Sequence, residues 1–203
     1  SYTPTYHQFF FKNAPILRIE VSEDECERSI PFLKELGLRW AAVTSPLKLK
    51  AGQMVEVVGP INTLCFDGEW RATNTDVFGL EHLLGELKNK RVAVWGGGGV
   101  LDSISAILPE ASFYSSRTGE IKKGEEVRDP DVILWGVGSK SFAEKGQFPP
   151  KDWPVQWVVD LNYTQDSPGL ECAHNYGCQY RSGLGMFQAQ AEKQQEFWSE
   201  CRV

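Results

Sequence analysis

Short runs of apolar residues alternate with amphipathic stretches along the whole chain. In the first part, this pattern predicts a strand at residues 16–21, a helix at 22–37 and a strand at 40–44. The helix is expected to begin at the capping box Ser22-Glu23-Asp24-Glu25 and to end at Gly37. Its expected buried stripe consists of Ile30, Leu33 and Leu36. A strand, a helix and a strand in this order favour a parallel sheet with a crossover helix.

A hairpin and a long helix are expected next. Asp67-Gly68 is a turn signal between two apolar runs, which predicts two antiparallel strands. From Asp76, a helix is predicted to run to Lys88-Asn89-Lys90. Its apolar residues near helical spacing are Phe78, Leu80, Leu83, Leu84 and Leu87. We place the first domain boundary at the end of this helix, which gives a domain of residues 1–88.

The second half of the chain reads as strands separated by helices and loops. An apolar strand at 91–95 runs into Gly96-Gly97-Gly98-Gly99, and a helical pattern follows. Further apolar runs at 113–115, 131–135 and 155–161 suit buried strands. The remaining predicted elements are a helix from about 169, a strand at 178–180 and a helix at 184–201. The order predicts an α/β fold with a second domain at 89–183 and a C-terminal helix within 184–203.

Composition and charge narrow the class of protein. The chain has 203 residues, of which 41% are hydrophobic and 24% charged, as in an ordinary soluble globular protein. A net charge of -6 spread along the sequence argues against a nucleic-acid partner. No apolar run is long enough to cross a bilayer, so a cytoplasmic protein without a membrane partner is expected. The pattern is compatible with a monomer or a homodimer.

The cysteines suggest neither a metal site nor a disulfide framework. They are odd in number and contain no Cys-x-x-Cys pair. The five are Cys26, Cys65, Cys172, Cys178 and Cys201. Two of them flank His174, but the spacing fits no standard zinc site, so no metal is predicted.

The glycine-rich turn indicates a nucleotide site. Glycines between a strand and a helix expose backbone N–H groups that can hold a pyrophosphate. About 20 residues after the first glycine, such sites carry an acid for NAD or an arginine for the 2'-phosphate of NADP. Arg117 occupies this position and no acid does, which favours NADP. The alternative is an exposed arginine in a turn.

A hydroxyl and an amine follow the strand at 40–44. Pro46 cannot continue a sheet ladder, so Thr44 and Lys48 are predicted to lie in a loop that the strand positions. A lysine held in this way can act as a general acid or base. The alternative is a solvated loop lysine.

Seven segments in the same order resemble the shikimate dehydrogenase family. They are Ser1-Tyr2-Thr3-Pro4-Thr5-Tyr6-His7-Gln8, Thr44-x-Pro46-x-Lys48, Asn62-Thr63, Asn74-Thr75-Asp76, Val94-Trp95-Gly96-Gly97-Gly98-Gly99, Asp160-Leu161-Asn162-Tyr163 and Gly183-Leu184-Gly185-Met186-Phe187-Gln188-Ala189-Gln190. The resemblance spans nearly the whole chain, and its strength lies in the collinear set.

The resemblance implies an N-terminal α/β substrate-binding domain, a Rossmann-like NADP-binding domain and a C-terminal helix that returns to the substrate domain. It implies reversible hydride transfer between NADP(H) and 3-dehydroshikimate/shikimate or a related alicyclic hydroxy acid, with Lys48 and Asp76 as the catalytic pair. The implied substrate-binding residues are Ser1, Thr3, Thr44, Asn62, Tyr163 and Gln190. The implied cofactor-binding residues are Gly96, Gly98, Gly99, Arg117, Thr118 and Gly183.

The chain also departs from the family pattern. Ala42 stands where the family has an asparagine, which removes one polar contact and allows a substrate such as quinate or an amino-substituted ring. Leu101 occupies a position where a small residue normally lets helix and strand approach closely. The interval from Arg117 to Asp131 is too short for the usual helix and strand, so the nucleotide domain is predicted to have lost a unit of its sheet.

Two functions of different classes therefore follow. The first is an NADP-dependent reductase of the shikimate type, which the Lys48 and Asp76 pair favours. The second is a non-catalytic member that binds a small hydroxy acid or a partner, which the reduced nucleotide domain favours.

Overall fold

The computed structural model describes His7 and residues 16–201. The candidate residues Ser1 and Thr3 lie outside the described part. The chain divides into two compact units. Unit 1 comprises Ser1–Phe78 and Gln188–Val203, and unit 2 comprises Gly79–Phe187. Each unit is described by itself.

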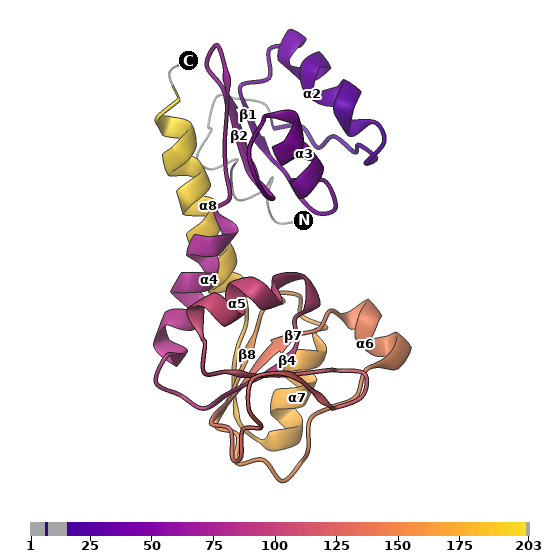
Figure 1. The fold of residues 1–203 in the computed structure, drawn as a ribbon, viewed down its shortest axis with the longest axis vertical. Helices are drawn as coiled ribbons and strands as arrows, with labels where there is room; N and C mark the ends of the chain where they lie inside the picture. Colours follow the sequence, from indigo (N-terminus) through magenta and orange to yellow (C-terminus); the bar gives the residue numbers. More distant parts are fainter. Residues whose placement is uncertain (1–6, 8–15, 202–203) are drawn as a thin grey trace. The chain divides into compact units, whose positions relative to one another are not determined.

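Unit 1 is built on an antiparallel sheet of three strands. Its elements are α2 (Cys26–Glu35), β1 (Trp40–Ala42), α3 (Lys48–Met54), β2 (Thr63–Phe66) and β3 (Trp70–Thr73). The sheet order is β1-β2-β3, and β2 and β3 form the predicted hairpin around Asp67-Gly68. Figure 1 shows α2 and α3 beside this sheet in indigo and purple.

The predicted parallel sheet with a crossover helix is wrong for this unit. Residues 16–21 form no strand, and β1 pairs with β2 in the antiparallel sense. Leu17 is 76% exposed and Ile19 is 49% exposed. Without a buried face, an apolar run of this length has nothing to hold it in a ladder.

α2 begins and ends close to the predicted points. Glu25 accepts hydrogen bonds on Oε2 from the backbone N and the Oγ of Ser22, and Gly37 ends the helix with a φ of 80°. Ile30 is buried, but Leu36 is 67% exposed. Leu36 follows the last helical residue and therefore does not continue the predicted stripe.

Unit 2 contains a sheet of six strands. They are β4 (Val92–Gly96), β5 (Ser112–Tyr114), β6 (Ile121–Lys123), β7 (Val132–Gly136), β8 (Trp157–Asp160) and β9 (Gln179–Arg181). The order is β6-β5-β4-β7-β8-β9, and only β6 is antiparallel to its neighbour. The predicted loss of a helix and a parallel strand is confirmed, since a short antiparallel strand follows β5 instead.

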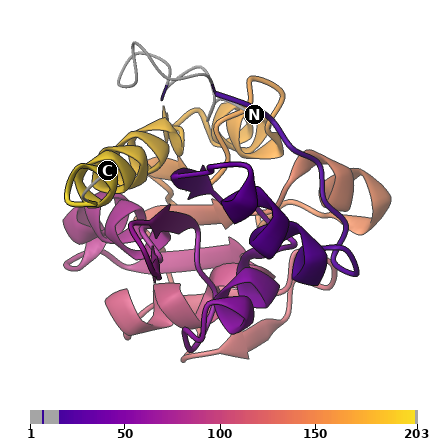
Figure 2. The same cartoon turned by 90° about the horizontal axis from the view of Figure 1, so that it is seen from above.

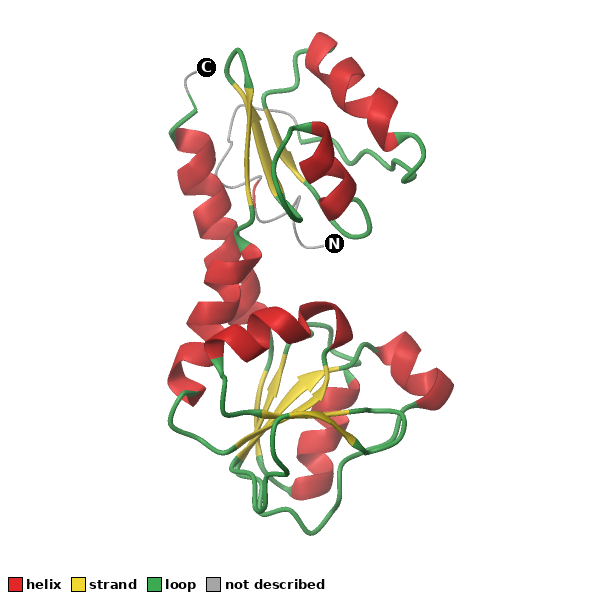
Figure 3. Cartoon of the chain, in the orientation of Figure 1, coloured by secondary structure: helices red, strands yellow, loops and turns green. Residues whose placement is uncertain are grey.

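Helices cover both faces of the unit 2 sheet, as the red and yellow elements of Figure 3 show. They are η2 (Gly98–Val100), α5 (Leu101–Ile107), α6 (Ser139–Lys145) and α7 (Pro168–Tyr176). Alternate strand residues belong to two separate cores: Val94 and Leu134 pack with Ile104 of α5, whereas Trp95 and Trp135 belong to the other core. Two buried faces explain the nearly continuous apolar runs in β4 and β7.

Two helices cross from one unit to the other. α4 (Asp76–Leu84), extended by η1 (Gly85–Leu87), changes unit after Phe78, and α8 (Leu184–Ser199) changes unit after Phe187. α8, the yellow helix, is seen along its length in Figure 1 and almost end-on in Figure 2. The functional domains predicted at 1–88, 89–183 and 184–203 stay a prediction.

The last part of α8 packs on the sheet of unit 1. One side of α8 is buried throughout and consists of Phe187, Ala191, Gln194 and Trp198. Gln194 Nε2 donates to the backbone O of Asn62 at 3.1 Å, and Trp198 Nε1 donates to the backbone O of Leu64 at 2.8 Å. Side chains one helical turn apart thus bind the carbonyl of Asn62, just before β2, and that of Leu64, within β2.

A disulfide joins Cys65 in β2 to Cys201 after α8. The expectation that the cysteines form no disulfide is therefore wrong. The two residues are 136 positions apart in sequence, and their Cα atoms are 6.6 Å apart. The spacing of cysteines along the chain could not reveal this disulfide. The two cysteines meet only because α8 packs back on β2.

Within the described residues, no helix is both long and apolar enough to cross a membrane.

An ion pair fixes the starts of the two central strands of unit 2. Arg91, just before β4, binds Asp131, just before β7, through Nε at 3.1 Å, an NH2 nitrogen at 2.8 Å and its backbone N at 3.1 Å. These hydrogen bonds from Arg91 hold the pKa of Asp131 at about 2, below the usual 3.8. The stabilisation is therefore complete above pH 4 and lost as the pH falls toward 2.

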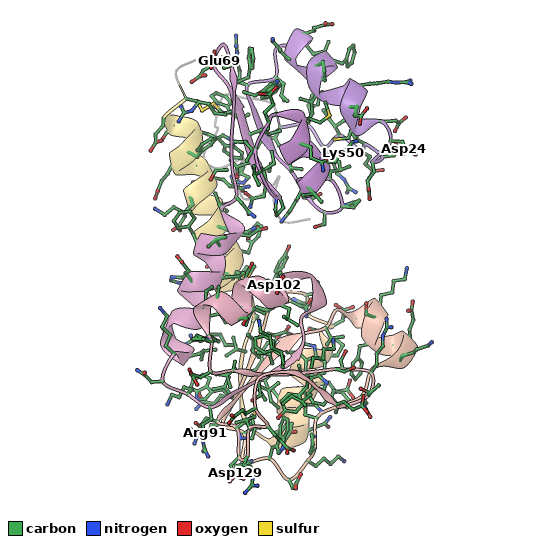
Figure 4. All side chains as sticks on the ribbon, viewed as in Figure 1. Asp24, Lys50, Glu69, Arg91, Asp102 and Asp129 are labelled. Carbon is green, nitrogen blue, oxygen red and sulfur yellow. A yellow bond between two sulfur atoms is a disulfide. The ribbon has the colours of Figure 1, made fainter. Side chains whose placement is uncertain are left out.

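We expect Asp131→Asn to lower the free energy of unfolding at pH 7, because it removes the ion pair with Arg91. The loss should be only about 1 kcal/mol, since the Arg91 guanidinium is half exposed and partly screened. Urea unfolding at pH 7 and pH 2.5 measures this, and the difference from wild type should shrink at the lower pH. Asp129→Asn is the control, since Asp129 is exposed near Arg91 (Figure 4) without an ion pair to it among the described residues. Equal losses in both variants would contradict the prediction.

Candidate functional site

The amine of Lys48 and the carboxylate of Asp76 meet in unit 1. Lys48 Nζ donates to Asp76 Oδ2 in a close ion pair. Lys48 is the first residue of α3, not the loop residue predicted, because the turn at 45–47 leads directly into the helix. Asp76 is the first residue of α4. The two side chains are 24% and 23% exposed, so solvent or a ligand can reach the pair.

A buried amide orients Asp76. Asn62 is 2% exposed, and its Nδ2 donates to Asp76 Oδ1 at 2.8 Å and to Thr75 Oγ1 at 3.0 Å. Its Oδ1 accepts from the backbone N of Thr75 at 2.8 Å and from Thr63 Oγ1 at 2.7 Å. One oxygen of Asp76 is thus held by an amide and the other by an amine, which fixes the plane of the carboxylate.

The start of α4 supports the same arrangement. The backbone N of Asp76 donates to Asn74 Oδ1 at 3.1 Å, which turns the chain from β3 into the helix. A carboxylate at a helix N-terminus is favoured by the helix dipole. The Asp76 carboxylate is therefore placed both by the local turn and by its ion pair with Lys48.

A second polar layer lies behind this pair. Gln194 is 4% exposed and connects the Asn62 carbonyl oxygen to His7, whose Nε2 lies 3.0 Å from Gln194 Oε1. Burial lowers the pKa of His7, which favours a neutral ring. Gln190, one turn earlier in α8, is only partly buried. Sequence reasoning placed Gln190 in the site and saw Gln194 only as a residue of the helix face.

Thr44 is exposed in the turn that follows β1, and its carbonyl oxygen accepts from the backbone N of Leu47. The structure brings Lys48, Asp76 and Asn62 together. The roles of Thr44, Asn62 and Gln190 in binding a substrate remain predictions.

Unit 2 has a cavity of about 460 Å³ at the carboxyl ends of its central strands. It lies where β4 is flanked by β5 on one side and β7 on the other, which is the point where the strand order reverses. Open α/β sheets bind ligands in such a crevice. The lining residues are Gly96, Gly97, Gly98, Ser115, Ser116, Arg117, Lys122, Gly136, Val137, Gly138 and Ser141.

Glycine is required in the floor of this cavity. Gly96 and Gly97 have φ values of 84° and 78°, which side-chain-bearing residues rarely adopt. A Cβ on Gly136 would lie 2.6 Å from the Cα of Gly97, and the N of Gly97 donates to the O of Gly136 at 3.1 Å. The turn after β4 therefore lies directly against the end of β7, with bare backbone toward the cavity.

Arg117 lines the cavity from the turn after β5, and its role beside a ribose stays a prediction. The Oγ of Ser115 accepts from the backbone N of Arg117 at 3.3 Å and of Thr118 at 3.2 Å, which shapes this turn. Gly96 and Gly98 also line the cavity, whereas Thr118 and Gly183 are not among its described lining residues, and the surroundings of Gly99 lie outside what the structure describes. Their roles in binding a cofactor remain predictions.

Buried Asp160 fastens the segment after β8 that carries Tyr163. Its carboxylate accepts from the backbone N of Asn162 at 2.8 Å, from Ser167 Oγ at 2.5 Å and from the Tyr180 hydroxyl at 3.1 Å. Burial raises the pKa of Asp160. The ring of Tyr163 is 36% exposed and lies 5.3 Å from that of Phe187. Tyr163 stays a predicted substrate contact.

Gly183 begins the connection into α8. Its N donates to the O of Asn162 at 2.9 Å, and a Cβ there would lie 2.5 Å from the O of Leu161. Close packing of two backbones accounts for a glycine at this position.

Sequence reasoning missed Ser115, Ser116, Lys122, Gly136, Gly138 and Ser141 in the cavity wall. Most of them follow the carboxyl end of a predicted strand. Because ligands of open α/β sheets bind at these ends, this position could have indicated that the residues line the site. Lys122 had no such signal, because β6 was not predicted.

The cavity has features that fit a dinucleotide. Backbone N–H groups lie in the glycine turn, and the lining residues include two cations but no carboxylate. A side chain on Gly136 would prevent the glycine turn from packing against β7. These features suit a phosphorylated nucleotide, because phosphates bind to bare backbone amides and to cations.

Curated proteins of similar sequence share one name. The chain is 27% identical over 208 residues to the NADP(+) shikimate dehydrogenase of Methylobacillus flagellatus, covering 84% of this chain and 77% of the relative. It is 26% identical over 248 residues to that of Moorella thermoacetica, covering 98% and 84%. For that of Archaeoglobus fulgidus, the values are 27% over 238 residues, 98% and 88%. No protein-family model matches the chain.

Solved structures give the same fold. Shikimate dehydrogenase from Aquifex aeolicus matches with a TM-score of 0.76 at 24% identity, covering 100% of this chain and 89% of that one. A shikimate dehydrogenase in complex with NADP+ matches with a TM-score of 0.75 at 21% identity, covering 98% and 85%. The Listeria monocytogenes enzyme in complex with shikimate and NAD matches with a TM-score of 0.74 at 22% identity, covering 98% and 87%.

The two-unit α/β fold and the collinear similarity over almost the full length of these relatives lead to one conclusion: the chain is similar in sequence and in fold to shikimate dehydrogenases.

Proposed function

We propose that this protein is an NADP-dependent oxidoreductase that transfers a hydride reversibly between NADP(H) and 3-dehydroshikimate/shikimate or a related alicyclic hydroxy acid. The observation that carries the proposal is the Lys48–Asp76 pair held by Asn62. The names of the curated relatives and the cavity of unit 2 support it. Ala42, which stands where the family has an asparagine, leaves a related alicyclic acid as open as shikimate itself.

In this proposal, the residues of unit 1 bind the substrate and move its proton. Oxidation of a ring hydroxyl needs a base for the hydroxyl proton, and reduction of the ketone needs an acid. Lys48 fills both roles, while Asp76 orients its amine. Asn62 acts on Asp76 through the 2.8 Å hydrogen bond and keeps the carboxylate plane constant between the two protonation states of the lysine.

The cofactor residues are those of the unit 2 cavity. Bound NADP(H) supplies the hydride acceptor or donor. The glycine turn would hold the pyrophosphate, and Arg117 would bind the 2'-phosphate through its guanidinium. Because Gly136 has no side chain, the backbone of Gly97 can pack directly against it at the floor of the cavity.

One observation favours the second candidate, a non-catalytic member that binds a small hydroxy acid or a partner. The short antiparallel β6 stands where the family has a helix and a parallel strand, so the sheet beside the cavity departs from the family pattern. Retention of the Lys48–Asp76 pair favours the enzyme, because a binding module has no need of a proton-transfer pair.

We expect Lys48→Ala to lower turnover of shikimate with NADP+ by about 10²–10⁴-fold, since it removes the acid–base group. The measurement is the absorbance of NADPH formed. Lys50→Ala is the matched control: Lys50 lies two residues later in α3 and pairs with Glu27 of α2. Turnover that survives in Lys48→Ala, or is lost equally in Lys50→Ala, would remove Lys48 from the mechanism.

We expect Arg117→Ala to raise the dissociation constant of NADP+ about tenfold or more, and to leave that of NAD+ unchanged, because only NADP+ carries the 2'-phosphate. Tryptophan fluorescence titration measures both. Arg128→Ala, an exposed arginine outside the cavity wall, is the control. If the folded wild-type protein binds neither dinucleotide, the reductase is contradicted and the binding member is favoured.

A further inference from the structure

We propose that the Cys65–Cys201 disulfide of unit 1 is a reversible thiol–disulfide exchange site, at which Cys201 reacts with a small external disulfide such as oxidised glutathione. Opening of this bond loosens the contact of α8 with Asn62 and thereby weakens the binding of substrate. The exchange chemistry is independent of the proposed function, whereas the effect on substrate binding rests on it.

Three bonds in a row hold α8 to β2 and to the residue just before β2. In order along the helix, they are Gln194 to the carbonyl oxygen of Asn62, Trp198 to that of Leu64, and Cys201 to Cys65. We call this row the α8 seam. Of its three bonds, the disulfide alone is covalent, and it closes the end of the seam opposite Asn62. A covalent bond at one end keeps the groups at the other end at a high effective concentration.

The far end of the seam reaches the candidate site. The carbonyl oxygen of Asn62 accepts from Gln194, while its side chain donates to Asp76 at 2.8 Å. Asp76 in turn pairs with Lys48. Motion of α8 away from β2 therefore removes a partner of the residue that orients this pair. A small displacement of such groups is enough to change binding and rate.

A cation lies beside Cys201. A guanidinium nitrogen of Arg71 in β3 is 3.9 Å from the Sγ of Cys201 and 3.5 Å from Oδ2 of Asp67. The Cζ of Arg71 lies 5.4 Å from the centre of the Phe197 ring, which helps to hold the side chain at the sulfur. The ion pair with Arg71 also offsets the charge of Asp67, whose carboxylate lies within 4.8 Å of both sulfurs. A cation beside a sulfur favours the thiolate, which is the nucleophile in exchange.

Its place just after a helix makes Cys201 the more accessible sulfur. Cys201 is 5% exposed and Cys65 is 0% exposed. α8 ends at Ser199, whereas Cys65 lies in the middle strand of the three-stranded sheet. Helix ends open locally at a lower free energy than strands that are paired on both sides. Local opening thus exposes Cys201 first, and an external reagent meets this sulfur before its partner.

The three free cysteines are poorer candidates for exchange. Burial raises the pKa of Cys26, Cys172 and Cys178, which disfavours the thiolate at each of them. They therefore serve as internal standards, whose state should not depend on the redox buffer.

The exchange balances with glutathione as the only co-reactant. The Cys201 thiolate attacks one sulfur of oxidised glutathione, forms a mixed disulfide and releases one glutathione thiolate. The Cys65 thiolate then attacks the Cys201 sulfur of the mixed disulfide and releases the second. Two protein thiols are thus oxidised to one disulfide, and oxidised glutathione is reduced to two thiols. The reverse sequence with reduced glutathione opens the bond.

The first test measures the exchange itself. Wild type is held in glutathione buffers of several reduced-to-oxidised ratios, quenched with acid, unfolded with a maleimide and analysed by mass spectrometry. We expect the number of labelled cysteines to change reversibly from three to five as the buffer becomes more reducing. A bond that stays closed in reduced glutathione, or does not form again in oxidised glutathione, would overturn the inference.

The second test identifies the reactive sulfur. In Cys65→Ser, we expect Cys201 to form an adduct with oxidised glutathione, and Arg71→Gln in that background to slow this reaction about threefold or more. Arg28→Gln removes the same charge from an exposed position of α2 and should leave the rate unchanged. If Cys65→Ser does not fold, a brief exposure of reduced wild type locates the first adduct by peptide mass spectrometry. A first adduct on Cys65, or equal rates in the two arginine variants, would contradict the assignment.

The third test follows the α8 seam. In reduced wild type and in Cys201→Ser, hydrogen exchange of the amides at 194–199 should quicken, and the KM of shikimate should rise about threefold to tenfold. The dissociation constant of NADP+ should stay constant, because its proposed cavity belongs to unit 2. Cys178→Ser, which removes a free thiol of unit 2, is the control and should match wild type.

Unchanged hydrogen exchange in the reduced protein, or an equal loss of NADP+ and shikimate binding, would overturn the link between the disulfide and the site. If the folded, oxidised protein neither binds nor turns over shikimate, the proposed function fails. The thiol labelling and the hydrogen exchange still decide the inference in that case, because neither readout needs a substrate.

Discussion

The contact between two glycines at the ends of β4 and β7 sets the shape of unit 2. The N–H of Gly97 donates to the carbonyl of Gly136, and neither residue has a side chain that would separate the two backbones. The chain therefore leaves β4 in a sharp left-handed turn at the point where the strand order reverses. Without this contact the turn would move away from the sheet, and its N–H groups would no longer line one cavity with Arg117.

Unit 1 builds its site by the opposite means, with a buried polar side chain in place of bare backbone. Asn62 uses both amide hydrogens and its oxygen in bonds to residues 63, 75 and 76. A buried amide with all its partners is rigid, and leaving one partner unmatched is expensive in free energy. The geometry of Asp76 toward Lys48 is thus fixed before any ligand binds.

Much of the fold was predictable, because periodicity and turn residues are local signals. The hairpin at Asp67-Gly68, the glycine turn after β4 and the C-terminal helix are confirmed. The predicted strand at 16–21 failed because burial depends on what packs against a run, which the run itself does not encode. The bulge at Lys122 and the meeting of Asn62 with Asp76 also arise from tertiary pairing. The pairing of Lys48 with Asp76 was implied by the resemblance, whereas the contacts of Asn62 and the bulge at Lys122 were not predictable from the sequence.

The disulfide between Cys65 and Cys201 closes residues 65–201 into a covalent ring. Every residue of unit 2, from Gly79 to Phe187, lies between these two cysteines in sequence. Unit 2 is thus part of a covalent loop between two segments of unit 1. The disulfide closes this loop at Cys65 in β2 and at Cys201 just after α8. A single break of the backbone anywhere in unit 2 would leave two fragments that remain one molecule until the sulfur bond is reduced.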